Sequence, residues 1–216
     1  MIVIKVGGSL FDAPALGPAL RAYLKALAPA EALLVPGGGS VADAVRAFDQ
    51  THGLGEEAAH WLALRSLSVT RALLEGLCGP PPPPPSLEKG GVEHAPRAEG
   101  AVEGSSVVPP LPFSREGGGG MGCTIRVLDC FAFAVEDDSR PGAIPHTWSV
   151  TTDSIAARAA AVFRAERLIL LKSVDVPPGV PWELAAANGW VDAHFPRVAA
   201  QLVCPVEAVN FRSRLI

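Results

Sequence analysis

The chain has 216 residues, of which 49% are hydrophobic and 19% are charged, and its formal net charge is -4. The length suffices for one α/β domain with a buried core, and the acidic balance argues against a nonspecific nucleic-acid binder, which needs a basic face. No apolar run approaches the ~20 residues of a membrane span, and no basic stretch precedes the first apolar run, so we expect a soluble, cytoplasmic protein. Its four cysteines form no CxxC pair and no zinc-like cluster, so we expect no metal held by protein ligands alone.

The first half of the chain predicts two buried strands, each followed by a glycine-rich turn and a helix. Residues 2–6 and 32–36 are continuous apolar runs rich in Val, Ile and Leu, which is typical of strands covered on both faces. Apolar residues at helical spacing predict one helix from Leu16 onward, another around Val41, and a longer helix over residues 56–77.

A change of composition interrupts this pattern at residues 79–122. This stretch holds ten of the 21 prolines and ten of the 22 glycines, including an unbroken hexaproline at 80–85 and a tetraglycine at 117–120. Such a sequence favours polyproline II and coil over a packed core. We interpret it as a low-complexity insertion in a surface loop of a single domain spanning residues 1–216. The alternatives are a docking segment for a proline-recognising partner and a lid over the substrate.

The second half of the chain returns to alternating strands and helices. The expected elements are strands at residues 125–127, 131–135, 167–172 and 206–209, and an Ala-rich helix over residues 154–164. Strands that alternate with helices indicate a mainly parallel sheet covered on both faces, so the fold class is α/β, a three-layer αβα sandwich. In such sheets ligands bind at the carboxyl ends of the strands, where both glycine turns are expected.

The two glycine turns, Gly7–Ser9 and Gly37–Gly39, are candidate anion sites. Consecutive glycines leave backbone N–H groups uncovered, and the N-terminus of a following helix adds partial positive charge. Neither turn matches the Walker pattern or the GxGxxG fingerprint, and each alone is equally well read as a tight turn, the second with Ser40 as helix N-cap. Two anion sites on neighbouring strands would suit phosphoryl transfer between two small molecules.

Two lysines lie within or at the end of apolar strands. Lys5 is costly inside a strand unless its ammonium reaches a polar site, so we expect it to contact a transferring phosphoryl group, although an edge-strand lysine could instead extend to solvent. Lys172 ends a second apolar run, where it would contact nucleotide phosphates or simply lie in solvent. Asp153 either caps the Ala-rich helix or holds one or two catalytic lysines by charge pairing.

Three further residues are candidates for the acceptor pocket. His60 lies on the long helix, where it either faces the pocket and binds phosphate or is an ordinary surface or core histidine. Asp43 and Arg46, on the helix after the second turn, either pair with each other or line the pocket.

In combination these residues resemble the amino acid kinase superfamily, which includes acetylglutamate kinase, bacterial uridylate kinase, aspartate kinase and isopentenyl phosphate kinase. The matching segments, in the family's order, are Lys5-Val6-Gly7-Gly8-Ser9-Leu10, Pro36-Gly37-Gly38-Gly39-Ser40, Thr151-Thr152-Asp153-Ser154-Ile155-Ala156-Ala157 and Leu171-Lys172-Ser173-Val174-Asp175. A narrower likeness is to the short kinases of methanofuran and tetrahydromethanopterin-type cofactor synthesis, whose archaeal members phosphorylate an aminomethylfuran phosphate to the diphosphate. It lies in residues 41–46, 59–64 and 148–154.

The resemblance implies transfer of the γ-phosphoryl group of ATP, with Mg2+, to a phosphate or carboxylate acceptor, in a homo-oligomer. It implies that Lys5 stabilises the transferring group, that Asp153 organises the lysines, and that Lys172 lies in the nucleotide half. The binding residues are then Gly7, Gly8 and Ser9 for the ATP phosphates, Gly37, Gly38 and Gly39 for the acceptor, and Thr152, Ser173 and Asp175 for the nucleotide. His60 is added to the acceptor set from its place on the long helix and not from the resemblance.

An ATP-dependent small-molecule kinase is therefore the favoured hypothesis. One alternative is a catalytically inactive, nucleotide- or anion-binding regulatory protein of the same fold, against which the retention of Lys5, Asp153 and Lys172 argues. Others are a kinase of a different acceptor, such as a nucleoside monophosphate or an acyl amino acid, and a scaffold that acts through the hexaproline.

Overall fold

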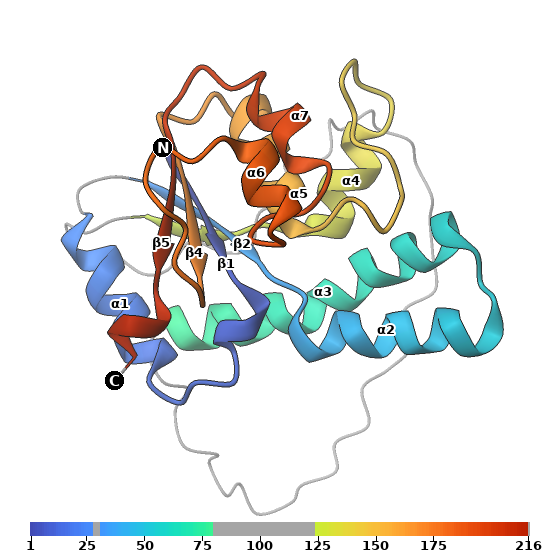
Figure 1. Ribbon diagram of the computed structural model, residues 1–216. Helices are drawn as coiled ribbons and strands as arrows, with labels where there is room; N and C mark the ends of the chain where they lie inside the picture. The colour runs from blue at the N-terminus through green and yellow to red at the C-terminus, as the bar shows by residue number, and fades with distance from the viewer. Residues whose placement is uncertain (28–30, 80–123, 216) are drawn as a thin grey trace, which may run out of the picture.

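The structure, a computed structural model, describes residues 1–27, 31–79 and 124–215 (Figure 1). In these ranges five strands form one sheet in the order β3-β2-β1-β4-β5, and every neighbouring pair is parallel. The strands are β1 (Ile2–Val6), β2 (Ala32–Pro36), β3 (Ile125–Val127), β4 (Arg167–Lys172) and β5 (Val206–Asn210). The expected α/β fold with a parallel sheet is confirmed, and β1 occupies its centre.

Helices cover both faces of this sheet. They are α1 (Leu16–Ala26), α2 (Gly39–His52), α3 (Glu56–Cys78), α4 (Cys130–Asp137), α5 (Thr152–Val162), α6 (Trp182–Ala187) and α7 (Phe195–Ala199), with short 3-10 turns η1 (Gly8–Leu10) and η2 (Arg212–Arg214). Figure 1 shows α5, α6 and α7 on one side of the strands, with α1 and part of α3 on the other. The three expected layers are therefore present.

Alternate residues of each strand enter two separate cores. Val3 and Leu168 pack into the core that contains α4, α5 and α7. Ile4 and Ile169, one position along, pack into the core that contains α1 and the C-terminal half of α3. Because side chains alternate across a sheet and both faces are covered, the inner strands β1, β2 and β4 are largely apolar runs.

The expected strand at residues 131–135 is wrong, because this segment belongs to helix α4. The carboxylate of Asp129 accepts a hydrogen bond from the amide of Ala132 at 3.0 Å and so caps the N-terminus of the helix. The buried residues of α4 recur at helical spacing, and they are Cys130, Phe133, Ala134 and Asp137. A short apolar run does not separate a strand from a buried helix by periodicity alone.

The remaining expected elements are confirmed, with small differences at their ends. Helix α5 begins and ends two residues before the expected bounds of 154–164, and β5 extends one residue past 209. Of the Pro/Gly-rich stretch, only Gly79 is described, where it ends α3, and residues 80–122 lie outside the described residues. None of the helices in the described ranges combines the length and hydropathy needed to cross a membrane.

The two glycine turns touch each other through their backbones. Strands β1 and β2 pair so that Val6 lies opposite Pro36, which places both turns at the same edge of the sheet. A Cβ atom on Gly37 would lie 2.2 Å from the backbone nitrogen of Gly8, and a Cβ on Gly8 would lie 2.2 Å from that of Gly39. Only glycine permits this approach.

Replacing Gly37 by alanine is expected to destabilise the fold by about 2–3 kcal/mol or more, because the new methyl group meets backbone that has no rotamer with which to yield. Gly76→Ala is the matched control, since Gly76 lies inside α3 and a Cβ atom there would meet nothing within 4 Å, and it is expected to stabilise by about 0.5–1 kcal/mol. Urea unfolding measures both. Equal midpoints for Gly37→Ala and wild type would contradict the close approach.

Candidate active site

A buried cluster of three charged side chains lies at the carboxyl ends of β1 and β4. The Nζ of Lys172 donates a hydrogen bond to Oδ2 of Asp153 at 2.6 Å, and the Nζ of Lys5 lies 3.0 Å from Oδ1 of the same carboxylate. Lys5, Asp153 and Lys172 are 6%, 4% and 8% exposed. The expected pairing of Asp153 with both lysines is confirmed. The alternatives of an edge-strand lysine and a solvated strand end are wrong, since β1 is central and both lysines are buried.

The strand register explains how the cluster forms. Lys5 lies opposite Leu170, two residues before Lys172, so both lysines point to the same face of the sheet as Val3 and Leu170. That face packs against α5, whose first turn carries Asp153. The Asp153 carboxylate therefore lies over β1 and β4 and reaches the ammonium groups of both lysines.

The charges in this cluster set each other's protonation. Burial raises the pKa of the Asp153 carboxyl, but the two lysine ammoniums and their hydrogen bonds outweigh burial and hold it below its usual range. Burial and the like charge of Lys5 lower the pKa of Lys172 to about 8, although Asp153 opposes this. With both lysines protonated, the cluster carries one excess positive charge, which favours a bound anion.

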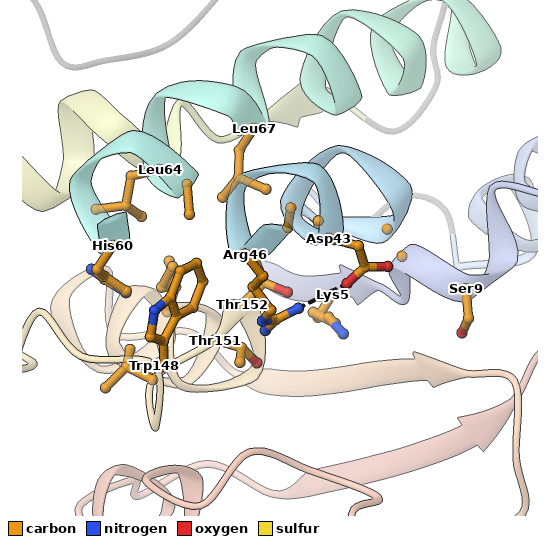
Figure 2. A pocket seen from close by; sticks show the side chains of 17 residues that line it. Lys5, Ser9, Asp43, Arg46, His60, Leu64, Leu67, Trp148, Thr151 and Thr152 are labelled. Carbon is orange, nitrogen blue, oxygen red and sulfur yellow. Dashed lines mark hydrogen bonds and ion pairs between the residues drawn. The ribbon is translucent and has the colours of Figure 1, made fainter. Parts of the chain in front are cut away.

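A pocket of about 280 Å³ opens next to Lys5 (Figure 2). One end is polar and is formed by Lys5 with Gly8, Ser9, Gly38 and Gly39 of the two turns. The other end is largely apolar, and Figure 2 shows His60, Leu64 and Trp148 gathered there, away from Ser9. The remaining lining residues are Ala42, Asp43, Arg46, Ala63, Leu67, Val150, Thr151, Thr152 and Ile155.

Not every glycine of the two turns offers its amide to this pocket. The N–H of Gly7 donates to the carbonyl of Leu171 at 2.9 Å, and that of Gly37 donates to the carbonyl of Val6 at 2.8 Å, so both amides extend the sheet and are taken. Gly8, Gly38 and Gly39 line the pocket instead, and Gly39 begins α2. Amides in the first turn of a helix have no intrahelical acceptor, and they can donate to an anion.

Trp148 forms a wall of the pocket and is fixed from three sides. Its Nε1 donates to Oδ2 of Asp49 at 2.9 Å, and its backbone N–H donates to Oε1 of Glu56 at 2.9 Å. The Arg46 guanidinium lies 4.9 Å from the centre of the indole ring. Arg46 also pairs with Asp43 at 2.9 Å, so these two residues both pair with each other and line the pocket.

His60 faces the pocket and is also an ordinary core histidine, while its expected binding of phosphate stays a prediction. It lines the pocket, and it is also a buried core histidine with a partner, since its Nδ1 lies 3.2 Å from Nδ1 of His146. His146 in turn stacks on Trp61 and pairs through Nε2 with Asp138 at 3.0 Å. Burial first, and then the neighbouring His146, lowers the pKa of His60 to about 4.

This histidine predicts an acid-dependent loss of stability. The unfolded chain takes up a proton on His60 near pH 6.5, whereas the folded chain does so only near pH 4, so the free energy of unfolding is expected to fall as pH drops through this window. The expected loss in the free energy of unfolding is on the order of 2 kcal/mol, which is less than the full pKa shift would give because solvent partly screens His60. Urea unfolding from pH 7 to pH 4 of wild type and His60→Asn measures it. The difference between them is expected to shrink at low pH, and a constant difference would contradict the pKa.

Two of the residues expected at the nucleotide, Ser173 and Asp175, follow Lys172 just past the end of β4. Ser9 and Ser173 are joined through their hydroxyls at 2.8 Å, and Asp175 accepts a hydrogen bond from the side-chain amide of Asn210 at 2.9 Å. Thr152, expected with this group, instead lines the pocket beside Lys5.

Among the residues that sequence reasoning missed, an arginine supports the first glycine turn. Arg212, near the C-terminus, forms two hydrogen bonds with the carboxylate of Asp12 and a third with the carbonyl of Ser9. It therefore holds the first glycine turn from the opposite end of the chain. Its sequence separation of about 200 residues from both partners left no local pattern to detect.

No protein-family model matches the chain, and no curated protein aligns with it as a relative.

Proposed function

We propose that this protein is an ATP-dependent phosphotransferase that acts on a small phosphate- or carboxylate-bearing acceptor. The observation that carries the proposal is the buried Lys5–Asp153–Lys172 cluster beside a pocket lined by the backbone of two glycine turns. Phosphoryl transfer depends on positioning and on neutralising the charge of the transferring group, and it needs little from a strong base. Two fixed ammonium groups and backbone amides supply that neutralisation.

The residues present fit ATP through its phosphates. Ser9 and Ser173 share a hydroxyl hydrogen bond just past β1 and β4, and Lys172 directly precedes Ser173, so these three residues would hold the phosphate oxygens. Lys5 and Ser9 both line the adjoining pocket. Within the described residues no group of three or more His, Cys, Asp or Glu side chains could hold a metal. Mg2+ would therefore arrive with ATP, coordinated largely by phosphate oxygens and water, and would neutralise phosphate charge there.

The pocket favours an acceptor with an anionic end and a small apolar body. Lys5, Gly8 and Gly39 suit the anion, while Leu64 and Trp148 suit an apolar or planar group. An aminomethylfuran phosphate meets this description, in agreement with the narrower family likeness. Nucleoside monophosphates and acyl amino acids are the competing acceptors.

The test is a turnover screen with purified full-length protein, ATP and Mg2+. ADP release and product phosphorus NMR are followed with aminomethylfuran phosphate, nucleoside monophosphates and acyl amino acids as acceptors, and a thermal-shift assay with a nonhydrolysable ATP analogue reports binding by mass action. Acceptor-dependent ADP formation supports the proposal. Binding of the analogue without turnover on any acceptor would instead support the inactive regulatory protein.

A fall in activity at alkaline pH is expected if both lysines must be charged. Because the pKa of Lys172 is about 8, kcat/KM should decline as pH rises through 8, since this parameter reports groups of the free enzyme. Lys172→Arg keeps the positive charge at all accessible pH values and should move the decline upward. A pH-rate profile from pH 6 to 10 decides this, and an unchanged profile in the arginine variant would contradict the role of Lys172.

A further inference from the structure

A single carboxylate outside the lysine cluster ties down the turn that carries Asp153. Asp192 lies in the loop between α6 and α7. Its Oδ2 accepts hydrogen bonds from the amide and hydroxyl of Thr151, at 3.0 and 2.9 Å, and from the amide of Ser154 at 2.9 Å. Its Oδ1 accepts from the hydroxyl of Ser154 at 2.5 Å and from the amides of His194 and Phe195, at 3.1 and 2.8 Å.

These bonds place Asp192 at the start of α5 as a cap supplied by a distant segment. Thr151, the residue at the N-cap position of α5, makes no side-chain capping bond to its own helix. Asp192 takes over that task from 38 and 41 residues away and bonds the residues on both sides of the Thr152–Asp153 pair. The position of the Asp153 carboxylate therefore depends on Asp192.

The charge of Asp192 acts on the same cluster. The charged groups that act on Lys172 are Lys5 on β1, Asp153 on α5, and Asp192, and the two carboxylates favour its protonated form. Loss of the Asp192 charge would therefore lower the pKa of Lys172 further. The hydrogen bonds of Asp192 hold Asp153 near both lysines, and its charge favours protonated Lys172, so both effects favour the ion-paired cluster.

We propose that Asp192 is a positioning residue for phosphoryl transfer, which holds the first turn of α5 so that Asp153 meets both lysines. This inference rests on the proposed function for its effect on turnover, but its effect on the cluster does not need a known substrate. All six groups that bond Asp192 are donors, and the two carboxylate oxygens accept from all of them. Asparagine has one side-chain oxygen, so its NH2 group would face donors where the second oxygen had been. Asparagine therefore cannot replace Asp192.

The experiment compares Asp192→Asn with Asp137→Asn in the full chain. Asp137 is a matched control, since it is also buried and also bonds α5, through Arg158 at 2.7 and 2.8 Å, but far from the first turn. The titration of Lys172 is followed by NMR of lysines labelled at Cε and Nζ, with Lys172→Arg to assign the signal. Turnover on the best acceptor is measured in parallel.

The expected result is a downward shift of the Lys172 midpoint of at least half a pH unit in Asp192→Asn and no shift in Asp137→Asn. At pH 8, kcat is expected to fall at least tenfold in Asp192→Asn and less than threefold in the control. An unshifted midpoint in folded Asp192→Asn, or equal shifts in both variants, would overturn the inference.

If Asp192→Asn does not fold, Ser154→Ala tests the same point, because it removes one of the six bonds and leaves the carboxylate in place. The NMR titration of Ser154→Ala should move in the same direction by a smaller amount, and no movement would overturn the inference. If wild type shows no turnover while the midpoint shifts as expected, the proposed function fails and the positioning of the cluster stands.

Discussion

Replacing Lys5 by methionine is expected to lower kcat by about 10²–10³-fold, the range for removing one preorganised group that stabilises transition-state charge. Lys5 is the lysine that lines the pocket, so it is placed to contact the group in transfer. Stability is expected to change little, because Asp153 keeps its hydrogen bond to Lys172 and methionine fills the space of the lysine stem. Steady-state kinetics and urea unfolding of the same preparation measure the two effects.

Lys25→Met is the control, since Lys25 is an exposed lysine in the last turn of α1. It should match wild type in kcat and in unfolding midpoint. Turnover of Lys5→Met within threefold of wild type on the accepted substrate would remove Lys5 from the catalytic machinery. A large loss of stability alongside the loss of turnover would show instead that Lys5 acts mainly in folding.

Replacing Asp153 by asparagine is expected to destabilise the fold by about 3–5 kcal/mol, because two buried ammonium groups would lose their shared counterion and repel each other. Since the pKa of Asp153 is lowered in the folded state, this difference from wild type is fully present near neutral pH and shrinks only as the pH falls below the usual carboxyl value of 3.8 toward the lowered folded pKa. Urea unfolding at pH 7 and at pH 3 gives the two values.

A triple variant separates stability from function in this cluster. Replacing Lys5 and Lys172 by methionine and Asp153 by leucine removes all three charges, and such a swap of buried ions for apolar residues is often neutral or stabilising. The triple variant is expected to unfold near the wild-type midpoint and to have no measurable turnover. A triple variant as unstable as Asp153→Asn would show that the charges are needed for the fold itself.

Much of this site could be predicted because its residues violate local rules in a readable way. A lysine inside an apolar strand needs a polar partner, and an acidic residue at the start of an Ala-rich helix, although capping alone would explain it, can supply one. The strand register then shows that the two lysines can share a partner. Lys5 lies two residues after Val3 and Lys172 two residues after Leu170, so both lysines point to the same face of the sheet. The fold class followed from the same continuous apolar runs.

The rest of the site depends on contacts that no local pattern contains. Asp192 acts on α5 across about 40 residues, and Trp148 is held by carboxylates from α2 and α3, so neither role is written in the neighbouring sequence. Gly7 and Gly37 were expected to bind anions, but their amides complete the sheet. Sequence reveals that a glycine is needed, and only the register reveals whether its N–H is free.

The backbone contact between Gly8, Gly37 and Gly39 also bears on how such a protein could change its substrate. In the proposed reaction, the two turns beside the transferring group are held together by main-chain contact, so their spacing does not depend on side chains that face the pocket. The reacting distance is thereby separated from the residues that select the acceptor, which come from α2, α3 and the loop of Trp148. Substitutions at those positions can change which acceptor binds while the geometry of phosphoryl transfer stays constant.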